Sequence, residues 1–261
     1  MMRWQEFIDG YDWKARLIPT AILLLPLFCT VYYFFPRVLN NPLQLAGSSL
    51  LSFALVYLAS MIFRDRGVRY ARQFWSERGG LPSTRFGRMR DSRLSPDQKK
   101  RIQLAVLRRF GIELMSLDEE CEYPTLADRK LLDAFREIKE YLRRCEGCEL
   151  VDKHGAEYGF ARNLCGSRLI FVVEAISGII ISGFGGTWPH WTLAPGCFAN
   201  LVLVLLWIPF AWLVLPRMLV LSAETYAGRA WMTFLSLSEG TSKKPSTFVN
   251  SVIDHQRVSS K

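Results

Sequence analysis

The chain has 261 residues, of which 50% are hydrophobic and only 22% are charged. Arg16 and Arg37 enclose 20 residues without a formal charge. The 48 residues between Arg168 and Arg217 contain one formally charged side chain, that of Glu174. Because a helix of about 20 apolar residues crosses the hydrocarbon core of a membrane, this pattern excludes a wholly soluble protein, a disordered chain and a disulfide-rich secreted domain.

Four apolar segments are long enough to be membrane-spanning helices. We predict these spans at residues 17–35, 43–63, 169–186 and 197–215. Short loops join the first to the second and the third to the fourth, so the predicted fold is an all-α membrane protein with four transmembrane helices as two hairpins. The predicted segments are the first hairpin (1–63), a helical cytoplasmic insert (64–167), the second hairpin with a helical extension (168–240) and a flexible tail (241–261).

The net charge of +9 indicates how these spans are oriented. Lys and Arg residues gather on one side of all four spans, whereas the two short loops together carry a single charge, that of Arg37. Cytoplasmic flanks collect basic residues, so we place both termini and the insert in the cytoplasm. We predict no disulfide, because Cys121, Cys145, Cys148 and Cys165 face that reducing compartment. Cys29 lies inside a predicted span, and Cys197 is near the outer face without a partner.

Two helices are predicted in the first part of the insert. One continues the second span as far as Gly79, where a Gly-Gly pair breaks it. The next begins at Ser95, whose side chain forms a capping box with that of Gln98, and ends at Gly111.

A longer amphipathic helix follows in the insert. It is predicted to begin at Thr125, with Asp128 three residues later, and to end at Gly147. Its apolar stripe consists of Leu131, Phe135, Ile138, Leu142 and Cys145. A further helix follows the last span to about residue 240, and it either lies along the membrane surface or returns to the insert. Its apolar side chains are Trp231, Phe234 and Leu237.

Glu174 is the charged residue inside the third predicted span. A charge at the centre of a bilayer costs about 2.5–3.5 kcal/mol on insertion scales. One interpretation is that Glu174 lines or gates a polar path. The alternative is that its side chain extends to the inner interface or pairs with Arg168, about one turn away. Further along this span, Gly178, Ser182 and Gly186 repeat every fourth residue. Such spacing allows close helix packing, either within the chain or in a homo-oligomer.

Basic side chains gather in the first half of the insert. Residues 64–109 contain 14 basic and 4 acidic side chains, and residues 110–167 contain 8 basic and 13 acidic ones. We predict that basic residues here bind anionic lipid headgroups or a partner. The candidates there are Arg85, Arg88, Arg90, Arg93, Lys99, Lys100 and Arg101, and Arg162, just before the third predicted span, is a further candidate. The alternatives are pairing with the acidic run at residues 118–122 and nucleic-acid binding, which is disfavoured because no aromatic stacking platform lies among the charges.

Patterns for catalysis and metal binding are weak in this chain. Cys145 and Cys148 form one close pair, whereas a structural zinc site usually has two. Asp133, Glu137 and Lys139 resemble the acidic and lysine set of some nucleases, but they lie on a periodic helix whose charged face is solvated. No glycine-rich phosphate loop or nucleophile elbow occurs in the sequence. We therefore expect neither an enzyme nor a metal or cofactor.

Three short motifs give the chain a family resemblance. They are GYD at 10–12 before RLIP at 16–19, LPST at 81–84 before RD at 90–91, and YGFARNL at 158–164. Together they resemble an uncharacterised family of bacterial multi-pass inner-membrane proteins, some of which are encoded near anti-phage defence genes. The resemblance covers the chain to about residue 168. It implies a bacterial inner membrane and a role in defence, and it assigns no catalytic residue. By its composition alone, YGFARNL is expected to form an elbow at the membrane interface, with Arg162 on lipid phosphates.

Two functions fit these features best. The first is an oligomeric channel-like or membrane-perturbing effector controlled through its cytoplasmic insert, suggested by Glu174 and the small-residue spacing. The second is a membrane scaffold without transport activity, whose insert docks a cytosolic protein. A transporter ranks below both, because four spans without an internal repeat would need oligomerisation to enclose a site.

Overall fold

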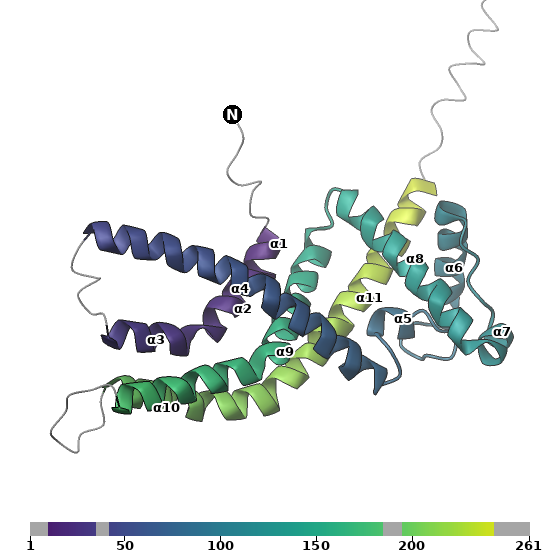
Figure 1. Ribbon diagram of the computed structural model, residues 1–261. Helices are drawn as coiled ribbons and strands as arrows, with labels where there is room; N and C mark the ends of the chain where they lie inside the picture. Colours follow the sequence, from purple (N-terminus) through teal and green to yellow (C-terminus); the bar gives the residue numbers. More distant parts are fainter. Residues whose placement is uncertain (1–9, 35–41, 185–194, 243–261) are drawn as a thin grey trace, which may run out of the picture. The chain divides into compact units, whose positions relative to one another are not determined.

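The protein is nearly all helical. The computed structural model describes residues 10–34, 42–184 and 195–242. No β-strand occurs in these ranges (Figure 1), which confirms the predicted all-α class. Within them, Glu149–Phe184 and Pro195–Gly240 are long and apolar enough to cross a membrane. Trp13–Leu23 and Leu25–Phe34 make a third candidate if this pair, bent by 48°, forms one span. These candidates overlap the third, fourth and first predicted spans.

The described residues form two compact units, each built from two separate stretches of the chain. Unit 1 comprises residues up to 85 together with residues 149–227. Unit 2 comprises residues 86–148 together with those from 228 onward. One helix, α11 (Leu215–Ser242), contributes to both units.

Unit 1 is built around the long helix α9. Its elements are α1 (Gly10–Asp12), the π-helix η2 (Trp13–Leu17), α2 (Ile18–Leu23), α3 (Leu25–Phe34), α4 (Pro42–Ser76), α5 (Pro82–Arg85), α9 (Glu149–Phe184), α10 (Pro195–Pro209), the π-helix η4 (Phe210–Val214) and the first part of α11. Helix α9 packs against η2, α2, α3, α4 and α10. The rings of Phe171 and Trp207 stack in this core with their centroids 4.2 Å apart. Because α4 continues to Ser76, it confirms that the second predicted span is followed by a helical continuation.

Prolines accompany the irregular backbone in unit 1. The chain bends by 48° between α2 and α3, and Pro26 follows the junction. Pro209 ends α10 and directly precedes the π-helix η4. Proline has no N–H group to donate and its ring clashes with the preceding turn, which explains why the regular helix is interrupted at these two points.

Helices α4 and α9 cross at a pair of glycines. A Cβ atom added to Gly166 would lie 2.6 Å from the Cα atom of Gly67. One added to Gly67 would lie 2.5 Å from Oδ1 of Asn163. Glycine therefore allows the two backbones to touch directly, as small residues do at helix crossings in membranes.

Unit 2 is a small helical assembly. It contains α6 (Pro96–Phe110), α7 (Leu117–Glu122), α8 (Pro124–Arg144) and α11 from Gly228 onward. Helix α6 begins at the predicted capping box, in which the side chains of Ser95 and Gln98 each accept from the other residue's main-chain N–H. It ends at Gly111, which has a φ angle of 68°. Both predicted ends of this helix are confirmed.

The apolar stripe of α8 forms the core of unit 2. Its buried members are Leu131, Phe135, Ile138 and Leu142, as the spacing predicts. The ring centroid of Phe135 lies 5.5 Å from that of Trp231, and Phe110 stacks on Phe234 at 5.6 Å. The helix after the last predicted span therefore returns to the insert, which decides between the two alternatives left open by the sequence.

Two local predictions are wrong. Helix α8 begins at Pro124, with Tyr123 as its N-cap residue, so Thr125 lies inside the helix. Asp128 binds Arg88 instead of serving as a cap. The YGFARNL segment is not an elbow, because it lies inside the unbroken helix α9.

Helix α7 is absent from the sequence prediction. A second capping box begins it, in which Ser116 and Glu119 cap each other. This six-residue helix is too short to show an apolar period and is mostly acidic, so a search for hydrophobic periodicity does not find it.

Candidate functional site

Small and polar residues lie together inside unit 1 on α3, α9 and α10. We call this group the polar seam, and its members are Thr30, Gly178, Ser182, Gly196 and Asn200. All five are buried. In a membrane-spanning bundle, lipid offers such polar groups no hydrogen-bond partner, so they must bind one another or another polar species.

Asn200 links the helices of the polar seam. Its Nδ2 atom donates to Oγ1 of Thr30 at 3.1 Å and to the main-chain oxygen of Gly196 at 3.0 Å. A Cβ atom added to Gly178 would lie 2.4 Å from Oγ1 of Thr30 and 2.6 Å from Nδ2 of Asn200. The small residue at position 178 therefore serves the packing of α9 against α3 and α10 within one chain.

Three of the buried side-chain oxygen atoms on α9 and α10 that have no hydrogen-bond partner among the described residues lie in the polar seam or one helical turn from it. They are Oδ1 of Asn200, Oγ of Ser182 and Oε2 of Glu174. Glu174 is half-buried and lies one helical turn before Gly178. Gly186, the last residue of the predicted small-residue spacing, lies outside the described residues. A buried unpaired polar atom costs about 1–3 kcal/mol, so this region has hydrogen-bonding capacity that its own side chains do not use.

The YGFARNL motif joins α9 to other helices of unit 1. Nδ2 of Asn163 donates to the main-chain oxygen of Ala15, in the π-helix η2, at 2.7 Å. The ring of Tyr158 is parallel to that of Tyr226 to within 4°. The guanidinium carbon of Arg162 lies 5.6 Å from the centroid of the Tyr158 ring. The motif therefore acts as a helix-contact element in this structure.

A side chain of α9 also contacts the second π-helix. Nη1 of Arg168 donates to the main-chain oxygen of Ala211, in η4, at 3.4 Å. The indole N–H of Trp207 donates to the main-chain oxygen of Arg168 at 3.0 Å. Arg168 and Glu174 are both described, and no ion pair joins them. The possible pairing of Glu174 with Arg168 is therefore not formed in this structure.

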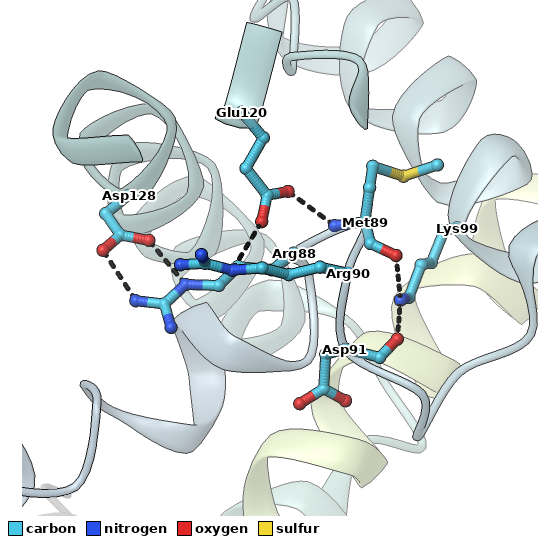
Figure 2. A network of polar contacts seen from close by, with 7 residues as sticks. All are labelled: Arg88, Met89, Arg90, Asp91, Lys99, Glu120 and Asp128. Carbon is cyan, nitrogen blue, oxygen red and sulfur yellow. Dashed lines mark hydrogen bonds and ion pairs between the residues drawn. The ribbon is translucent and has the colours of Figure 1, made fainter. Parts of the chain in front are cut away.

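A network of charged side chains holds the segment before α6. We call it the charged clip, and it consists of Arg88, Met89, Arg90, Asp91, Lys99, Glu120 and Asp128 (Figure 2). Arg88 donates two hydrogen bonds to the Asp128 carboxylate, at 2.7 and 2.6 Å. The buried Glu120 accepts from the main-chain N–H of Met89 at 2.6 Å and pairs with Nε of Arg90 at 3.2 Å. These contacts fasten the segment to α7 and α8.

Lys99 completes the charged clip from α6. The residue is only 3% exposed, and its Nζ atom donates to the main-chain oxygens of Met89, at 3.1 Å, and of Asp91. Burial lowers the pKa of Lys99 from its ordinary value, while the Asp91 and Glu120 carboxylates act in the opposite direction. The ammonium group is therefore directed into unit 2 and not toward solvent.

The other predicted lipid- or partner-binding residues are less buried. Arg101 forms an ion pair with a glutamate of α11 at 2.5 Å. The guanidinium of Arg93 lies 4.8 Å from the centroid of the Phe86 ring. Lys100 is exposed on α6, and Arg85 is half-buried at the end of α5. Neither Lys100 nor Arg85 forms an ion pair with a described residue.

Three members of the polar seam, Thr30, Gly196 and Asn200, are absent from the sequence prediction. All three are uncharged residues inside or directly beside apolar runs, where formal charge and the spacing of small residues in the third predicted span give no signal. An asparagine in a predicted span is itself a usable signal, because an amide surrounded by lipid needs a hydrogen-bond partner.

Within the described ranges, no three His, Cys, Asp or Glu side chains are arranged to hold a metal ion. Comparisons with protein-family models, with curated proteins and with solved structures find no match for this chain. Its function must therefore be inferred from the geometry of the polar seam and of the charged clip.

Proposed function

We propose that this chain is an integral protein of the bacterial inner membrane, and that it acts as a channel-like or membrane-perturbing effector controlled through its cytoplasmic part. The observation that carries this proposal is the set of buried, unpartnered oxygen atoms of Glu174, Ser182 and Asn200. They lie in helices that are candidates for membrane spans. Water or ions moving along the polar seam would bind these atoms, which lipid cannot do.

The proposal includes four spans, with the second in the N-terminal half of α4. Exposed apolar side chains on this helix support it, and they are Leu51, Phe53, Leu55, Tyr57, Leu58, Met61 and Ile62. So large an apolar surface is unfavourable in water and favourable in lipid. Basic residues begin directly after it, at Arg64, which supports a cytoplasmic location for both termini.

We also propose that the protein is a homo-oligomer. Glu174 is only half-buried in one chain, and a carboxylate on a spanning helix needs a polar partner. A second copy would supply that partner and would bring two carboxylates to a shared path. The resemblance to membrane proteins encoded near anti-phage genes supports a defence role, in which leakage of the inner membrane would stop an infected cell.

The contact between Asn200 and Thr30 suggests how the path is closed. Their hydrogen bond joins α10 to α3 across Gly178, which supports a closed seam at that level. In this proposal, opening requires the bond to break and α10 to move away from α3. The signal for that change is received by the cytoplasmic part.

Ion flux from liposomes that contain the full chain tests the proposal. Wild-type protein is expected to release trapped potassium, and Glu174→Gln to slow the release. Thr30→Val is expected to speed it, because valine removes the bond that closes the seam and leaves the Asn200 amide in place. Glu149→Gln, an exposed position at the start of the same helix, is the matched control and should change nothing. Liposomes that stay tight with both wild-type and Thr30→Val protein would contradict the proposal.

A non-transporting membrane scaffold is the second candidate function. Helix α6 exposes Leu104 and Leu107 next to Lys100 and Arg108. An exposed apolar pair beside cations suits a cytosolic protein with an apolar and acidic surface. If the chain is a scaffold, Leu104→Ser combined with Leu107→Ser will abolish cross-linking to a cytosolic partner in cells, and Glu174→Gln will have no effect.

A further inference from the structure

A cavity of about 460 Å³ lies in unit 1 between the η2–α2 segment, α9 and the first part of α11. Its volume is within the range of about 300–1,000 Å³ that is typical of small-molecule sites. One side of the lining is apolar and includes Ile18, Phe160, Met218 and Leu221. The other side carries Lys14, Lys153, His154 and Glu157. The cavity therefore combines an apolar wall with a charged rim.

The cavity lies at the end of the bundle where the first predicted span begins. The bond from Asn163 to the main-chain oxygen of Ala15 holds this part of α9 beside η2. Lys14 and Phe160 therefore lie at the same depth along the bundle. The distribution of basic residues assigns this depth to the cytoplasmic headgroup layer. Leu221 is 69% exposed, so the apolar wall is open to acyl chains from the bilayer.

The charges at the rim favour an anion. Lys14 and Lys153 are both exposed, and neither forms an ion pair with a described residue. Glu157 is the acidic residue of the lining, and its carboxylate is already in contact with Nδ1 of His154 at 2.9 Å. The two ammonium groups are therefore free to bind phosphate oxygens, as basic pockets between membrane helices do on the cytoplasmic side.

A second cavity of unit 1 has a different character. It measures about 530 Å³ and is lined by Asp12, Arg16, Arg64 and Asp65 among others. Arg16 pairs with Asp12 at 3.1 Å, and the acidic and basic side chains in the lining are equal in number. This balance gives no preference for an anion and leaves the first cavity as the candidate.

We propose that the cavity lined by Lys14 and Lys153 is a specific binding site for an anionic phospholipid of the cytoplasmic leaflet. The phosphate lies between the two ammonium groups, and an acyl chain covers the wall formed by Ile18, Phe160 and Leu221. Free phosphate shares the headgroup chemistry but has nothing to bury against that wall. The inference rests on the membrane location given above and not on ion conduction.

Lipid-dependent stability of the full chain in neutral detergent tests this site. The probes are dioctanoyl phosphatidylglycerol, dioctanoyl phosphatidylcholine and inorganic phosphate, each titrated while the thermal midpoint of unfolding is measured. A ligand that binds only the folded state stabilises it by RT ln(1 + L/Kd), where L is the free ligand concentration, so the midpoint rises once L exceeds Kd. Phosphatidylglycerol is expected to raise the midpoint progressively with the logarithm of its concentration, and the other two probes are expected to leave it unchanged.

Two double variants locate the effect. Lys14→Ala with Lys153→Ala is expected to weaken phosphatidylglycerol binding by roughly tenfold or more. Arg66→Ala with Arg72→Ala removes the same charge from exposed positions of α4 that line neither cavity, and it should leave the affinity unchanged. All of these side chains are exposed, so the midpoints without lipid should match that of the wild type. Leu221→Asn tests the apolar wall and should also weaken binding.

Several outcomes would overturn the site. Equal stabilisation by phosphatidylcholine would show that the site does not prefer an anionic headgroup. Equal phosphatidylglycerol affinities of the two double variants would show that the lipid does not bind at Lys14 and Lys153. A full shift with inorganic phosphate alone would mean that the cavity binds a soluble anion. The proposed ion conduction fails separately, when the liposomes stay tight, whereas extraction of the chain from vesicles by alkaline carbonate would overturn both proposals.

Discussion

The side-chain amide of Asn163 donates a hydrogen bond to the main-chain oxygen of Ala15, a residue 148 positions earlier in the chain, at 2.7 Å. Both residues are buried, with 2% of their surface exposed. Ala15 belongs to the π-helix η2, and π-helical turns are often found at functional sites. One motif residue thus fixes the first helical stretch of the chain against α9, next to the cavity proposed to bind lipid.

Replacing Asn163 by alanine is expected to destabilise unit 1. The substitution leaves the buried oxygen of Ala15 without its donor, which costs about 1–3 kcal/mol. The measurement is the midpoint of thermal unfolding in detergent. Ser76→Ala is the control, because Ser76 is exposed and its hydroxyl donates to Gln73 of its own helix. A similar loss in both variants would contradict the importance assigned to this bond.

Alanine at two glycines of α9 should have opposite effects. At Gly166 a Cβ atom would meet the Cα atom of Gly67 at 2.6 Å, and overpacking of this kind costs about 1–3 kcal/mol. At Gly183 the nearest atom is Sγ of Cys197 at 3.5 Å, an ordinary contact, and the higher helix propensity of alanine contributes up to about 1 kcal/mol. Gly166→Ala should therefore unfold at a lower temperature than the wild type and Gly183→Ala should not. Equal midpoints for the two variants would show that α4 and α9 do not touch there.

The ion pair between Arg88 and Asp128 is expected to contribute measurably to the stability of unit 2. Arg88 is 12% exposed and bonds both carboxylate oxygens, so a double-mutant cycle to alanine should give a coupling energy of about 1–2 kcal/mol. The pair of Arg136 and Asp133, whose side chains are 69% and 60% exposed, is the matched control with an expected coupling below about 0.5 kcal/mol. Comparable coupling in the two pairs would mean that the charged clip adds no more than a surface contact.

Lys99 is expected to give unit 2 a distinct dependence on alkaline pH. Because the pKa of Lys99 is lower in the folded protein than its ordinary value of 10.5, the unfolded chain binds more protons between the two pKa values. Stability contributed at this position therefore rises as the pH increases through the folded pKa toward 10.5. The difference in unfolding midpoint between the wild type and Lys99→Met should grow in that range, whereas Lys100→Met, at an exposed position, should show a constant difference. A constant difference for Lys99→Met as well would disprove the shift.

Local signals make parts of this fold predictable. Ser95 and Gly111 mark the ends of α6 because capping depends on neighbours a few residues apart, and the stripe on α8 is visible because burial repeats with the helical period. The sequence also indicates that Lys99 is buried and Lys100 is exposed, because Lys99 lies three residues before the buried Ile102 and on the same side of the helix. A reading based on charge alone treats both lysines as surface residues.

Contacts between segments that are far apart in the sequence could not be predicted. The bond from Asn200 to Thr30 joins residues 170 positions apart, and no local pattern records which oxygen an amide will reach. The same holds for Arg88 and Asp128, because a guanidinium and a carboxylate can pair with many partners along a chain. Glu174 could be found from the sequence because it is an isolated charge, whereas the neutral members of the polar seam require the packed helices to be recognised.

The division of unit 2 into two stretches has a consequence for how the protein is made. Phe110 and Phe135 leave the ribosome long before Trp231 and Phe234, the side chains against which they pack. Domains generally fold as units during synthesis, beginning with the N-terminal one, but here the partner helix follows the third and fourth predicted spans. The nascent insert must therefore keep its apolar stripe from aggregating until translation of the C-terminal helix is complete, which makes it a natural client for a chaperone.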